Sequence, residues 1–232
     1  RLRADGITAE AMRYAPAGIR VKGNPPLNRH PLFLDGSIEV QDEGSQLVAL
    51  LLEPRRGEMV VDYCAGAGGK TLALGAMMRS TGRLYAFDVS EHRLERIRPR
   101  LARSGLQNVH VQRIGEQADP KVGRLAGKIH RVLVDAPCSG LGTLRRNPDL
   151  KMRQSASGVR ELVRKQASIL ARSAQLPMPG GRLVYATCSL LPEENEQVVR
   201  QFLDAHPGFS VLPVQGILDR QKIPLGMSGE FL

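Results

Sequence analysis

From Gly57 onward the chain alternates short apolar segments with segments of helical periodicity, and this alternation limits the possible folds more than any other feature. The apolar segments expected to form strands are Met59–Tyr63, Arg83–Asp88, Asn108–Arg113, Ile129–Asp135, Gly181–Thr187 and Phe209–Val214. The segments expected to form helices are Thr71–Arg79, Glu91–Ser104, Gly158–Leu176 and Glu193–His206. Strands that alternate with helices form a parallel sheet covered by helices on both faces. The sequence therefore predicts an α/β fold with a mostly parallel sheet.

Residues 1–36 do not follow this alternation. The elements expected in and after them are a short helix at Thr8–Met12, a strand at Gly18–Lys22, two strands joined by a turn over Phe33–Val40, and a helix over Leu47–Leu52. A Pro-rich connection at 23–31 separates the first two from the rest. We therefore expect a small N-terminal appendage in front of the main domain.

The charge of the chain points to a polyanionic partner. Thirty-three Lys and Arg residues are spread along the whole chain, and the formal net charge is +10. Surplus positive charge on a folded domain favours nucleic acid through phosphate neutralisation and counterion release; a generally basic composition is the alternative explanation. Aromatic residues make up 4% of the chain and Trp is absent, which argues against a platform that stacks several bases.

The cysteine content indicates a reducing compartment. Cys64, Cys138 and Cys188 form no C-x-x-C pair and have no metal-ligand spacing, so no metal site is expected. No apolar run approaches the roughly 20 residues that a membrane-spanning helix needs, and no signal peptide is visible. We expect a cytoplasmic protein.

A glycine-rich loop follows the first expected strand and leads directly into a helix, with the sequence DYCAGAGGKT from Asp62 to Thr71. Small residues let a ligand approach the backbone, and a helix N-terminus offers free N–H groups. A phosphate-binding P-loop would need Gly where Cys64 stands. A dinucleotide fingerprint would need Gly where Thr71 stands. S-adenosylmethionine fits better, because its carboxylate suits the helix N-terminus without a large phosphate burden.

Asp88 ends the second expected strand, where an acidic side chain in such folds binds ribose hydroxyls. An Asp before a helix is also a common cap, here for the helix that begins near Glu91. Together with the glycine loop, we favour the ribose role.

Two cysteines follow neighbouring strands of the expected sheet. Cys138 comes after the fourth strand, in the sequence DAPCSG that begins at Asp135, and Cys188 follows the fifth strand. Because the carboxyl ends of parallel strands lie at the same edge of a sheet, both thiols are expected beside the glycine loop. A buried apolar cysteine and a disulfide are the alternatives. We favour a chemical role.

The reaction that uses a thiol beside S-adenosylmethionine is methylation of a pyrimidine at carbon 5. A thiolate that adds to carbon 6 of cytosine makes carbon 5 nucleophilic enough to accept a methyl group, and the thiol leaves after carbon 5 loses its proton. A basic environment would favour the thiolate. Asp135 is the candidate for stabilising the adduct at the ring nitrogen N3.

Several segments resemble the RNA 5-methylcytosine methyltransferase family, and within it the bacterial 16S ribosomal RNA methyltransferase B group. They are Asp135–Gly140, Arg145–Asp149, Ala186–Ser189, Gln41–Gln46 and Asp62–Lys70. The resemblance runs from about Leu32 to the C-terminus. It implies a class I S-adenosylmethionine-dependent methyltransferase, with a Rossmann-like, mostly parallel sheet of the seven-strand type.

The resemblance also implies roles for individual residues. Cys188 would be the nucleophile and Cys138 would assist release of the product, whereas DNA cytosine methyltransferases use the thiol at the position of Cys138. The residues implied in cofactor binding are Cys64, Ala65, Gly66, Gly68, Gly69, Lys70, Asp88, Arg93 and Asp135. Those expected at the RNA are Pro137, Arg145, Arg146, Asn147 and Lys151. A run of solvated charge is the alternative for the basic residues after the catalytic loop, and a solvated helix charge is the equal alternative for Arg93. The basic residues Arg160, Arg164, Lys165 and Arg172 are expected to form a solvated helix face.

The chain departs from the family pattern at two places. Glu116 stands near the point after the third strand where the family has an Asp that contacts the adenine amine. The chain also stops where family members continue through a last strand or hairpin. We interpret residues 1–36 as the remnant of an N-terminal RNA-binding or linker subdomain and 37–232 as the catalytic domain.

The expected function is methylation of a flipped or unpaired cytosine, in ribosomal RNA rather than transfer RNA, by a monomer. The alternative from another class is an RNA-binding assembly factor that has kept the fold and lost turnover.

Overall fold

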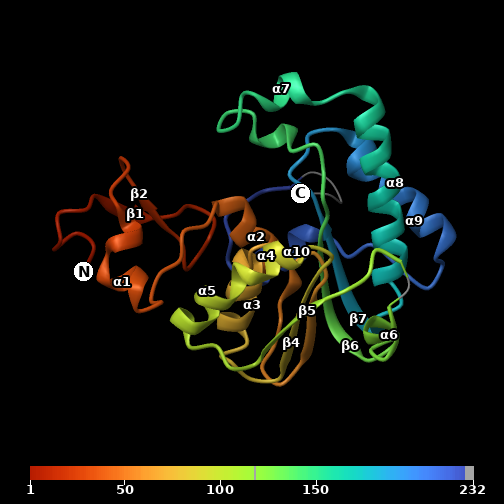
Figure 1. Ribbon diagram of the computed structural model, residues 1–232, viewed down its shortest axis with the longest axis horizontal. Helices are drawn as coiled ribbons and strands as arrows, with labels where there is room; N and C mark the ends of the chain where they lie inside the picture. Colours follow the sequence, from red (N-terminus) through yellow and green to blue (C-terminus); the bar gives the residue numbers. More distant parts are fainter. Residues whose placement is uncertain (118, 228–232) are drawn as a thin grey trace.

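The computed structural model describes residues 1–117 and 119–227, and its centre is a parallel sheet of five strands (Figure 1). The strands are β3 (Met59–Asp62), β4 (Arg83–Asp88), β5 (Val109–Arg113), β6 (Ile129–Asp135) and β7 (Pro177–Ala186). They lie in the order β5-β4-β3-β6-β7, and every neighbouring pair is parallel. The chain runs outward from β3 to one edge and then crosses to the other side of β3, so the strand order reverses between β3 and β6. Open α/β sheets bind ligands at such a switch point.

Helices cover both faces of the sheet, as the alternation of strands and helices predicts. On one face α2 (Glu43–Leu52) and α3 (Gly69–Met77) cover Val60, Leu84 and Leu133. On the other face α8 (Ala156–Ser173) packs through Ile169 on a layer that includes Val61, Phe87 and Val132. Adjacent residues of one strand, such as Val60 and Val61, thus point to opposite cores, as the period of two in a strand requires. The helices α4 (Glu91–Glu95), α5 (Ile97–Ser104), α6 (Pro120–Gly123) and α9 (Glu196–Ala205) complete the two outer layers.

The expected elements of the main domain are largely confirmed, with three differences. The expected helix over Glu91–Ser104 is divided into α4 and α5 at Arg96, and Pro99 lies in the first turn of α5, where a backbone N–H has no helical partner in any case. The expected strand Phe209–Val214 is wrong: these residues lead into the helix α10 (Val214–Arg220). The described residues form five parallel strands, not the seven of the seven-strand type, and the last hairpin implied by the resemblance lies outside them.

The expected elements near the N-terminus are partly wrong. Thr8–Met12 is not a helix, since β1 (Ala9–Ala11) pairs antiparallel with β2 (Ile19–Val21). Phe33–Val40 is not a pair of strands, because α1 (Pro31–Leu34) begins there. Pro31 suits a first helical turn, and the ring Nδ1 of His30 accepts a hydrogen bond from the Leu32 N–H at 3.2 Å. The strand expected at Gly18–Lys22 is confirmed as β2.

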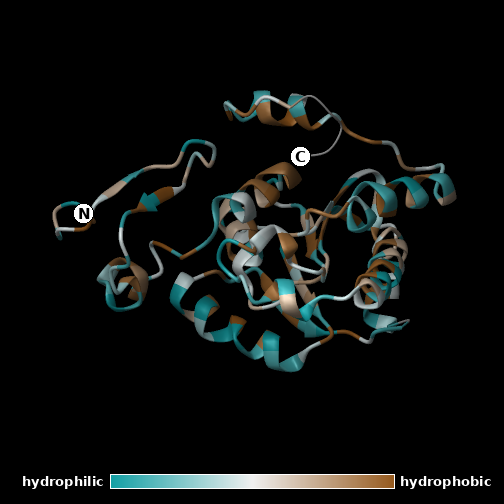
Figure 2. Cartoon of the chain, turned by 90° about the horizontal axis from the view of Figure 1, so that it is seen from above, coloured by the Kyte–Doolittle hydropathy of each residue, from teal (hydrophilic) through white to brown (hydrophobic). Residues whose placement is uncertain are grey.

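The N-terminal segment lies to one side of the sheet, and a carboxylate of α2 bonds to it (Figures 1 and 2). Oε1 of Glu43 accepts hydrogen bonds from the backbone N–H groups of Tyr14 and Ala15 at 2.8 and 3.3 Å. Oε2 of Glu43 pairs with Nη2 of Arg20 at 3.2 Å. The segment is therefore attached to the main domain at the start of α2.

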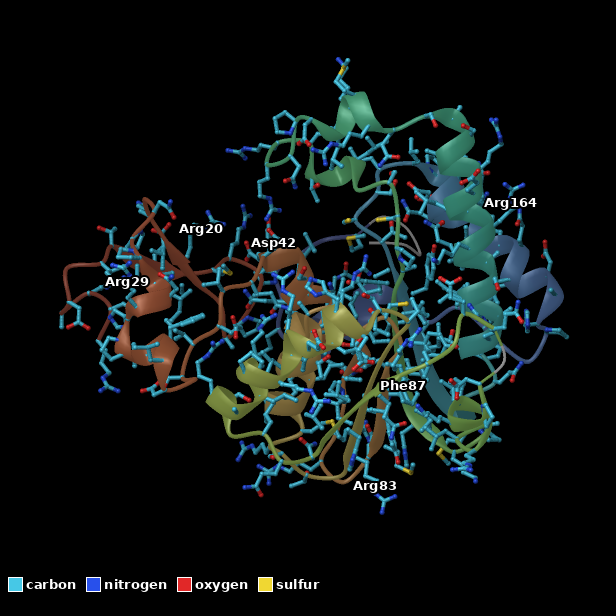
Figure 3. All side chains as sticks on the ribbon, viewed as in Figure 1. Arg20, Arg29, Asp42, Arg83, Phe87 and Arg164 are labelled. Carbon is cyan, nitrogen blue, oxygen red and sulfur yellow. The ribbon has the colours of Figure 1, made fainter. Side chains whose placement is uncertain are left out.

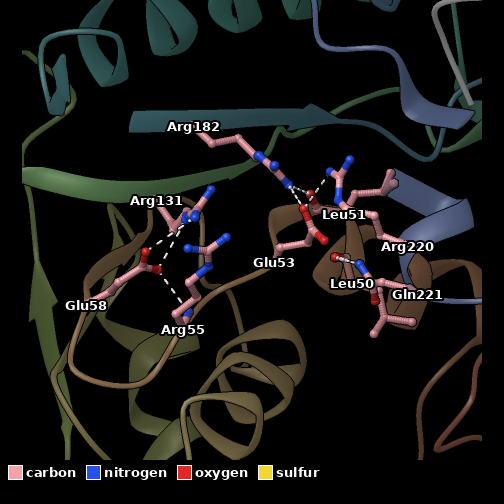
Figure 4. Close-up of polar contacts among 9 residues, drawn as sticks. All are labelled: Leu50, Leu51, Glu53, Arg55, Glu58, Arg131, Arg182, Arg220 and Gln221. Atoms are coloured by element: carbon pink, nitrogen blue, oxygen red, sulfur yellow. Dashed lines mark hydrogen bonds and ion pairs between the residues drawn. The ribbon is translucent and has the colours of Figure 1, made fainter. Parts of the chain in front are cut away.

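A second carboxylate ties the C-terminal helix to the sheet (Figure 4). Glu53 ends α2 with a φ of 46°, and its Oε2 accepts from Arg182 of β7 at 2.8 Å and from Arg220 of α10 at 3.0 Å. Gln221, which follows α10, donates to the carbonyl oxygen of Leu50 at 2.7 Å. These contacts fix α10 against α2 and the edge strand β7. In residues 1–117 and 119–227, no helix combines the length and apolar character needed to cross a membrane.

Candidate active site

A cavity of about 820 Å³ lies where the carboxyl ends of the five strands meet. Each strand contributes a wall residue at or just after its end, namely Asp62, Asp88, Ile114, Asp135 and Cys188. The loops that follow the strands, the segment before α2 and the helices α2, α3, α4 and α8 contribute further wall residues. The cavity is therefore at the switch point of the sheet, as the sequence predicts.

The glycine loop forms one side of this cavity. Cys64, Ala65, Gly66, Gly69 and Lys70 line it. The fourth small residue, Gly68, is absent from the cavity wall and instead makes the turn into α3, with a φ of 86°. A Cβ at that position would lie 2.9 Å from Cγ1 of Ile97, so the turn requires glycine.

Asp88 holds the glycine loop in place. Its Oδ2 accepts a hydrogen bond from the Gly66 N–H at 2.9 Å, and its Oδ1 accepts from the Ser90 N–H at 2.8 Å. Asp88 also lines the cavity, so the ribose role stays a prediction. The cap of α4 is Ser90, whose side chain accepts from the Arg93 N–H, and not Asp88. Arg93, one turn further along the chain, lines the cavity as well.

Two carboxylates and one amine lie at the floor of the cavity. Nζ of Lys70 pairs with Oδ2 of Asp135 at 2.6 Å. Asp62 is 1% exposed, and its Oδ2 accepts from the Thr71 hydroxyl at 2.7 Å. Burial raises the pKa of Asp62 to about 7, and the nearby charge of Asp135 acts in the same direction. Asp62 therefore titrates near neutrality, whereas the carboxylate of Asp135 has a cationic partner.

The two predicted cysteines meet at the mouth of the cavity. Their sulfur atoms are 3.3 Å apart as free thiols, within hydrogen-bond distance. The hydrogen bond from Cys138 lowers the pKa of the Cys188 thiol, and the same bond together with burial raises the pKa of Cys138. Cys188 is also the more exposed of the two. The pair therefore favours the thiolate at Cys188, and the thiolate is the nucleophilic form of a cysteine side chain.

The residues expected at the RNA fall into two groups. Pro137 lines the cavity, whereas Arg145, Arg146, Asn147 and Lys151 lie outside its wall, in and before α7 (Leu150–Arg153). Nη2 of Arg146 pairs with Oδ2 of Asp42 at 2.7 Å, and Asp42 does line the cavity (Figure 3). This segment thus borders the entrance.

Comparison with known proteins gives the family. The model of the family described as 16S rRNA methyltransferase RsmB/F matches residues 49–228. The chain belongs to this family. A Synechocystis protein named probable ribosomal RNA small subunit methyltransferase B is 37% identical over 210 residues, which are 90% of this chain and 47% of that protein. The chain thus spans about half the length of the curated relatives it matches.

Solved structures agree with this membership of the RsmB/F family. A crystal structure described as PH0851 is 36% identical with a TM-score of 0.87, and the match covers 91% of this chain and 48% of that one. NSun6 from Pyrococcus horikoshii, solved with SFG, is 28% identical with a TM-score of 0.71, and covers 81% of this chain and 48% of that one. The fold is the class I, Rossmann-like methyltransferase fold.

The cavity residues fit S-adenosylmethionine, the cofactor that this fold implies. A Cβ at Gly66 would meet nothing nearer than the Cys64 carbonyl oxygen at 4.0 Å, so the loop leaves open space on the cavity side. The nine-residue helix α3 starts at Gly69 and directs its first N–H groups there. Asp62 Oδ1 is buried in the same wall and has no hydrogen-bond partner in the described part of the chain.

Sequence reasoning missed several wall residues of this RsmB/F-family site. Lys165 and Arg172, expected on a solvated face of α8, line the cavity with Ser168 and Ile169. Glu116, which the sequence already placed near the expected adenine contact, lines it too, and its Oε1 pairs with Nζ of Lys165 at 3.2 Å. Two further residues, Glu194 and Asn195, bond to the cysteine loops from outside the wall. Lys165, Ser168 and Arg172 lie at helical spacing on one side of α8. This periodicity is the sequence signal that could have identified them as one face.

Proposed function

We propose that this chain is the catalytic part of an S-adenosylmethionine-dependent methyltransferase that methylates carbon 5 of a cytosine in ribosomal RNA. The main support is the pair of cysteine sulfurs, 3.3 Å apart, in the wall of the cavity that the glycine loop also lines. The family match and the Synechocystis relative point to ribosomal RNA as the substrate. Free thiols at all three cysteines suit the cytoplasm, and we propose action there as a monomer.

The glycine loop and the residues near it hold the cofactor in this proposal. Residues Cys64–Lys70 hold the methionine end of the cofactor, Asp88 holds the ribose, and Arg93 lies beside them. The bound cofactor supplies the methyl group. In place of the family's Asp, Glu116 is the candidate for the adenine amine, because it lines the cavity after β5.

The base is held by the other half of the site. Cys188 adds as a thiolate to carbon 6 of the cytosine, which makes carbon 5 nucleophilic. The addition moves an electron pair onto N3, which takes up a proton from solvent. Asp135 stabilises the adduct by accepting a hydrogen bond from the protonated N3, and Lys70 keeps its carboxylate oriented through the 2.6 Å contact. Cys138 assists release of the methylated base after carbon 5 has lost its proton. Pro137, Arg145, Arg146, Asn147 and Lys151 contact the RNA around the extruded base.

A covalent trap tests both the reaction and the two thiol roles. Cys138→Ala protein is incubated with unmodified ribosomal RNA and S-adenosylmethionine and run on a denaturing gel. We expect a shifted protein–RNA band, because the adduct through Cys188 forms and is not resolved. Wild-type protein should accumulate far less of it, and adding Cys188→Ala to Cys138→Ala should abolish it.

Two other outcomes would contradict this assignment. A trap formed by Cys188→Ala alone would exchange the two thiol roles, as in DNA cytosine methyltransferases. No adduct with any variant, together with no binding of S-adenosylmethionine by titration, would favour the RNA-binding assembly factor instead.

A further inference from the structure

Glu194 is a buried carboxylate behind the loop that carries Cys138. It is 0% exposed and ends the short helix η3 (Pro192–Glu194). Its Oε1 accepts hydrogen bonds from the Ser139 N–H at 2.8 Å and from Nε2 of Gln166 at 2.9 Å, and its Oε2 accepts from the Ser139 hydroxyl at 2.5 Å. Gln166 in turn donates to the Pro137 carbonyl oxygen at 2.9 Å. Glu194 therefore holds the backbone on both sides of Cys138.

The charge of Glu194 is stabilised by these contacts. Burial alone would raise the pKa of Glu194, but the hydrogen bonds from Ser139, Ser189 and Gln166 outweigh burial, and the pKa is lowered. Removal of the carboxylate would leave the buried Ser139 N–H without a partner. A buried donor without a partner is unfavourable, so the loop would move to satisfy it.

Asn195, the next residue, forms hydrogen bonds to the loop that carries Cys188. Its Oδ1 accepts from the Thr187 hydroxyl at 2.5 Å. Its Nδ2 donates to the carbonyl oxygens of Ser189 and Leu191 at 3.1 and 3.0 Å. Thr187 and Ser189 are the two neighbours of Cys188, so Asn195 bonds on both sides of that cysteine, to the side chain of Thr187 and to the backbone of Ser189.

The two loops also touch each other directly. The hydroxyl oxygens of Ser139 and Ser189, each of which follows a cysteine, are 3.1 Å apart. The Gly142 N–H donates to the Cys188 carbonyl oxygen at 2.9 Å, and the Cys188 N–H donates to Sγ of Cys138 at 3.3 Å. The dipeptide Glu194–Asn195 and these three contacts thus surround the pair of thiols. Within residues 1–117 and 119–227, the side chains of the dipeptide bond to the two loops and to Gln166, which itself supports the Cys138 loop.

We propose that Glu194 and Asn195 are positioning residues that hold the Cys138 loop and the Cys188 loop at the distance at which the two thiols share a hydrogen bond. The inference deepens the proposed function, since it rests on these thiols being the reactive pair. Neither side chain lines the cavity, so both act through the loops and not on the base.

The reactivity of Cys188 reports on this distance without RNA or cofactor. Cys188 faces Cys138, Asp135 and Lys70, and of these the hydrogen bond from Cys138 has the largest effect in lowering the Cys188 pKa. The experiment measures the rate of iodoacetamide alkylation of Cys188 between pH 5 and 9, assigned by peptide mass spectrometry. The variants are Glu194→Ala, Glu194→Gln and Asn195→Asp, with Glu193→Ala, an exposed neighbour, as the matched control.

Glu194→Ala and Asn195→Asp should slow alkylation of Cys188 at pH 7 roughly tenfold and move its midpoint up towards about 8.5, the value of an ordinary cysteine. In Asn195→Asp a carboxylate oxygen faces two carbonyl oxygens, which displaces the Cys188 loop without a large change of volume. Glu194→Gln keeps one acceptor oxygen and offers an N–H to the Ser139 hydroxyl, so it should remain within about twofold of wild type.

The inference is overturned if the folded Asn195→Asp protein alkylates with the wild-type rate and midpoint. It is also overturned if Glu193→Ala shifts the profile as far as Glu194→Ala does. Should Glu194→Ala fail to fold, Asn195→Asp decides alone. Because no RNA is present, a failure of the covalent trap with an intact alkylation shift would count against the proposed function and not against this inference.

Discussion

At the scale of single residues, Asp62 makes the stability of the protein depend on pH. Its folded pKa is raised to about 7 by burial, whereas an unfolded Asp titrates near 3.9. The folded state therefore keeps a proton that the unfolded state has lost between these values. The free energy of unfolding should fall as pH rises from about 4 to about 7, by at most about 1.4 kcal/mol per pH unit, and should change little above that range.

Asp62→Asn removes this titration while its amide oxygen can still accept from Thr71. The difference in unfolding free energy, variant minus wild type, should therefore become more positive between pH 5 and pH 8. Urea unfolding at the two values measures it. A difference that is equal at both would mean that Asp62 is ionised throughout.

Gly142 is a second residue with its own prediction, because no side chain fits at its position. A Cβ at Gly142 would lie 2.8 Å from the Cys188 carbonyl oxygen, closer than such contacts allow. Gly142→Ala should displace the Cys188 loop and slow single-turnover methylation at least tenfold, with the dissociation constant for S-adenosylmethionine unchanged. Gly123→Ala is the control, because a Cβ there meets nothing within 4 Å. Equal rates for the two variants would show that the Cys188 loop tolerates the shift.

At the scale of elements, the N-terminal segment depends on α2 for its position. Glu43 accepts from two backbone N–H groups and one guanidinium of that segment. Glu43→Gln should therefore accelerate amide hydrogen exchange in β1 and β2 while exchange in β3 and β6 stays unchanged. Glu10→Gln, which loses only an exposed contact with Lys22 at 3.7 Å, is the control. Unchanged exchange in β1 and β2 would mean that other contacts hold the segment.

The elements also show why parts of the structure were predictable. β4 and β6 are confirmed with the expected bounds, because each contains a short buried apolar run, Leu84–Phe87 and Val132–Val134, and ends at an Asp. Phe33–Val40 and Phe209–Val214 mix apolar and polar residues in a pattern that strands and short helices share. The cysteines and glycine loop were found from local motifs. Glu194 was not, because it bonds to Ser139 and Gln166, 55 and 28 residues away, and no local pattern records such contacts.

At the scale of the whole molecule, basic side chains occupy both ends of the sheet, and only one end holds the cavity. Arg145 and Lys151 are exposed beside the entrance, with no ion pair in residues 1–117 and 119–227, and Arg164 extends from α8 on the same side (Figure 3). Arg83 projects from the opposite end of the sheet. Under the proposed function, the net charge of +10 would attract RNA to every face, and contacts at the entrance would hold it in register with the thiols.

Salt dependence separates these two contributions. Each phosphate contact that is lost reduces the slope of log K against log salt by about 0.7 for a single strand. The double variant Arg145→Ala and Lys151→Ala should therefore weaken RNA binding and lower the slope by about 1.4. The double variant Arg83→Ala and Arg124→Ala removes the same charge from exposed positions away from the entrance, and it should leave the slope within about 0.3 of wild type. Fluorescence anisotropy titrations at about 50 to 300 mM salt measure the slope of log K against log salt for both double variants. Equal slopes for the two double variants would mean that RNA is held by net charge alone, with no register at the cavity.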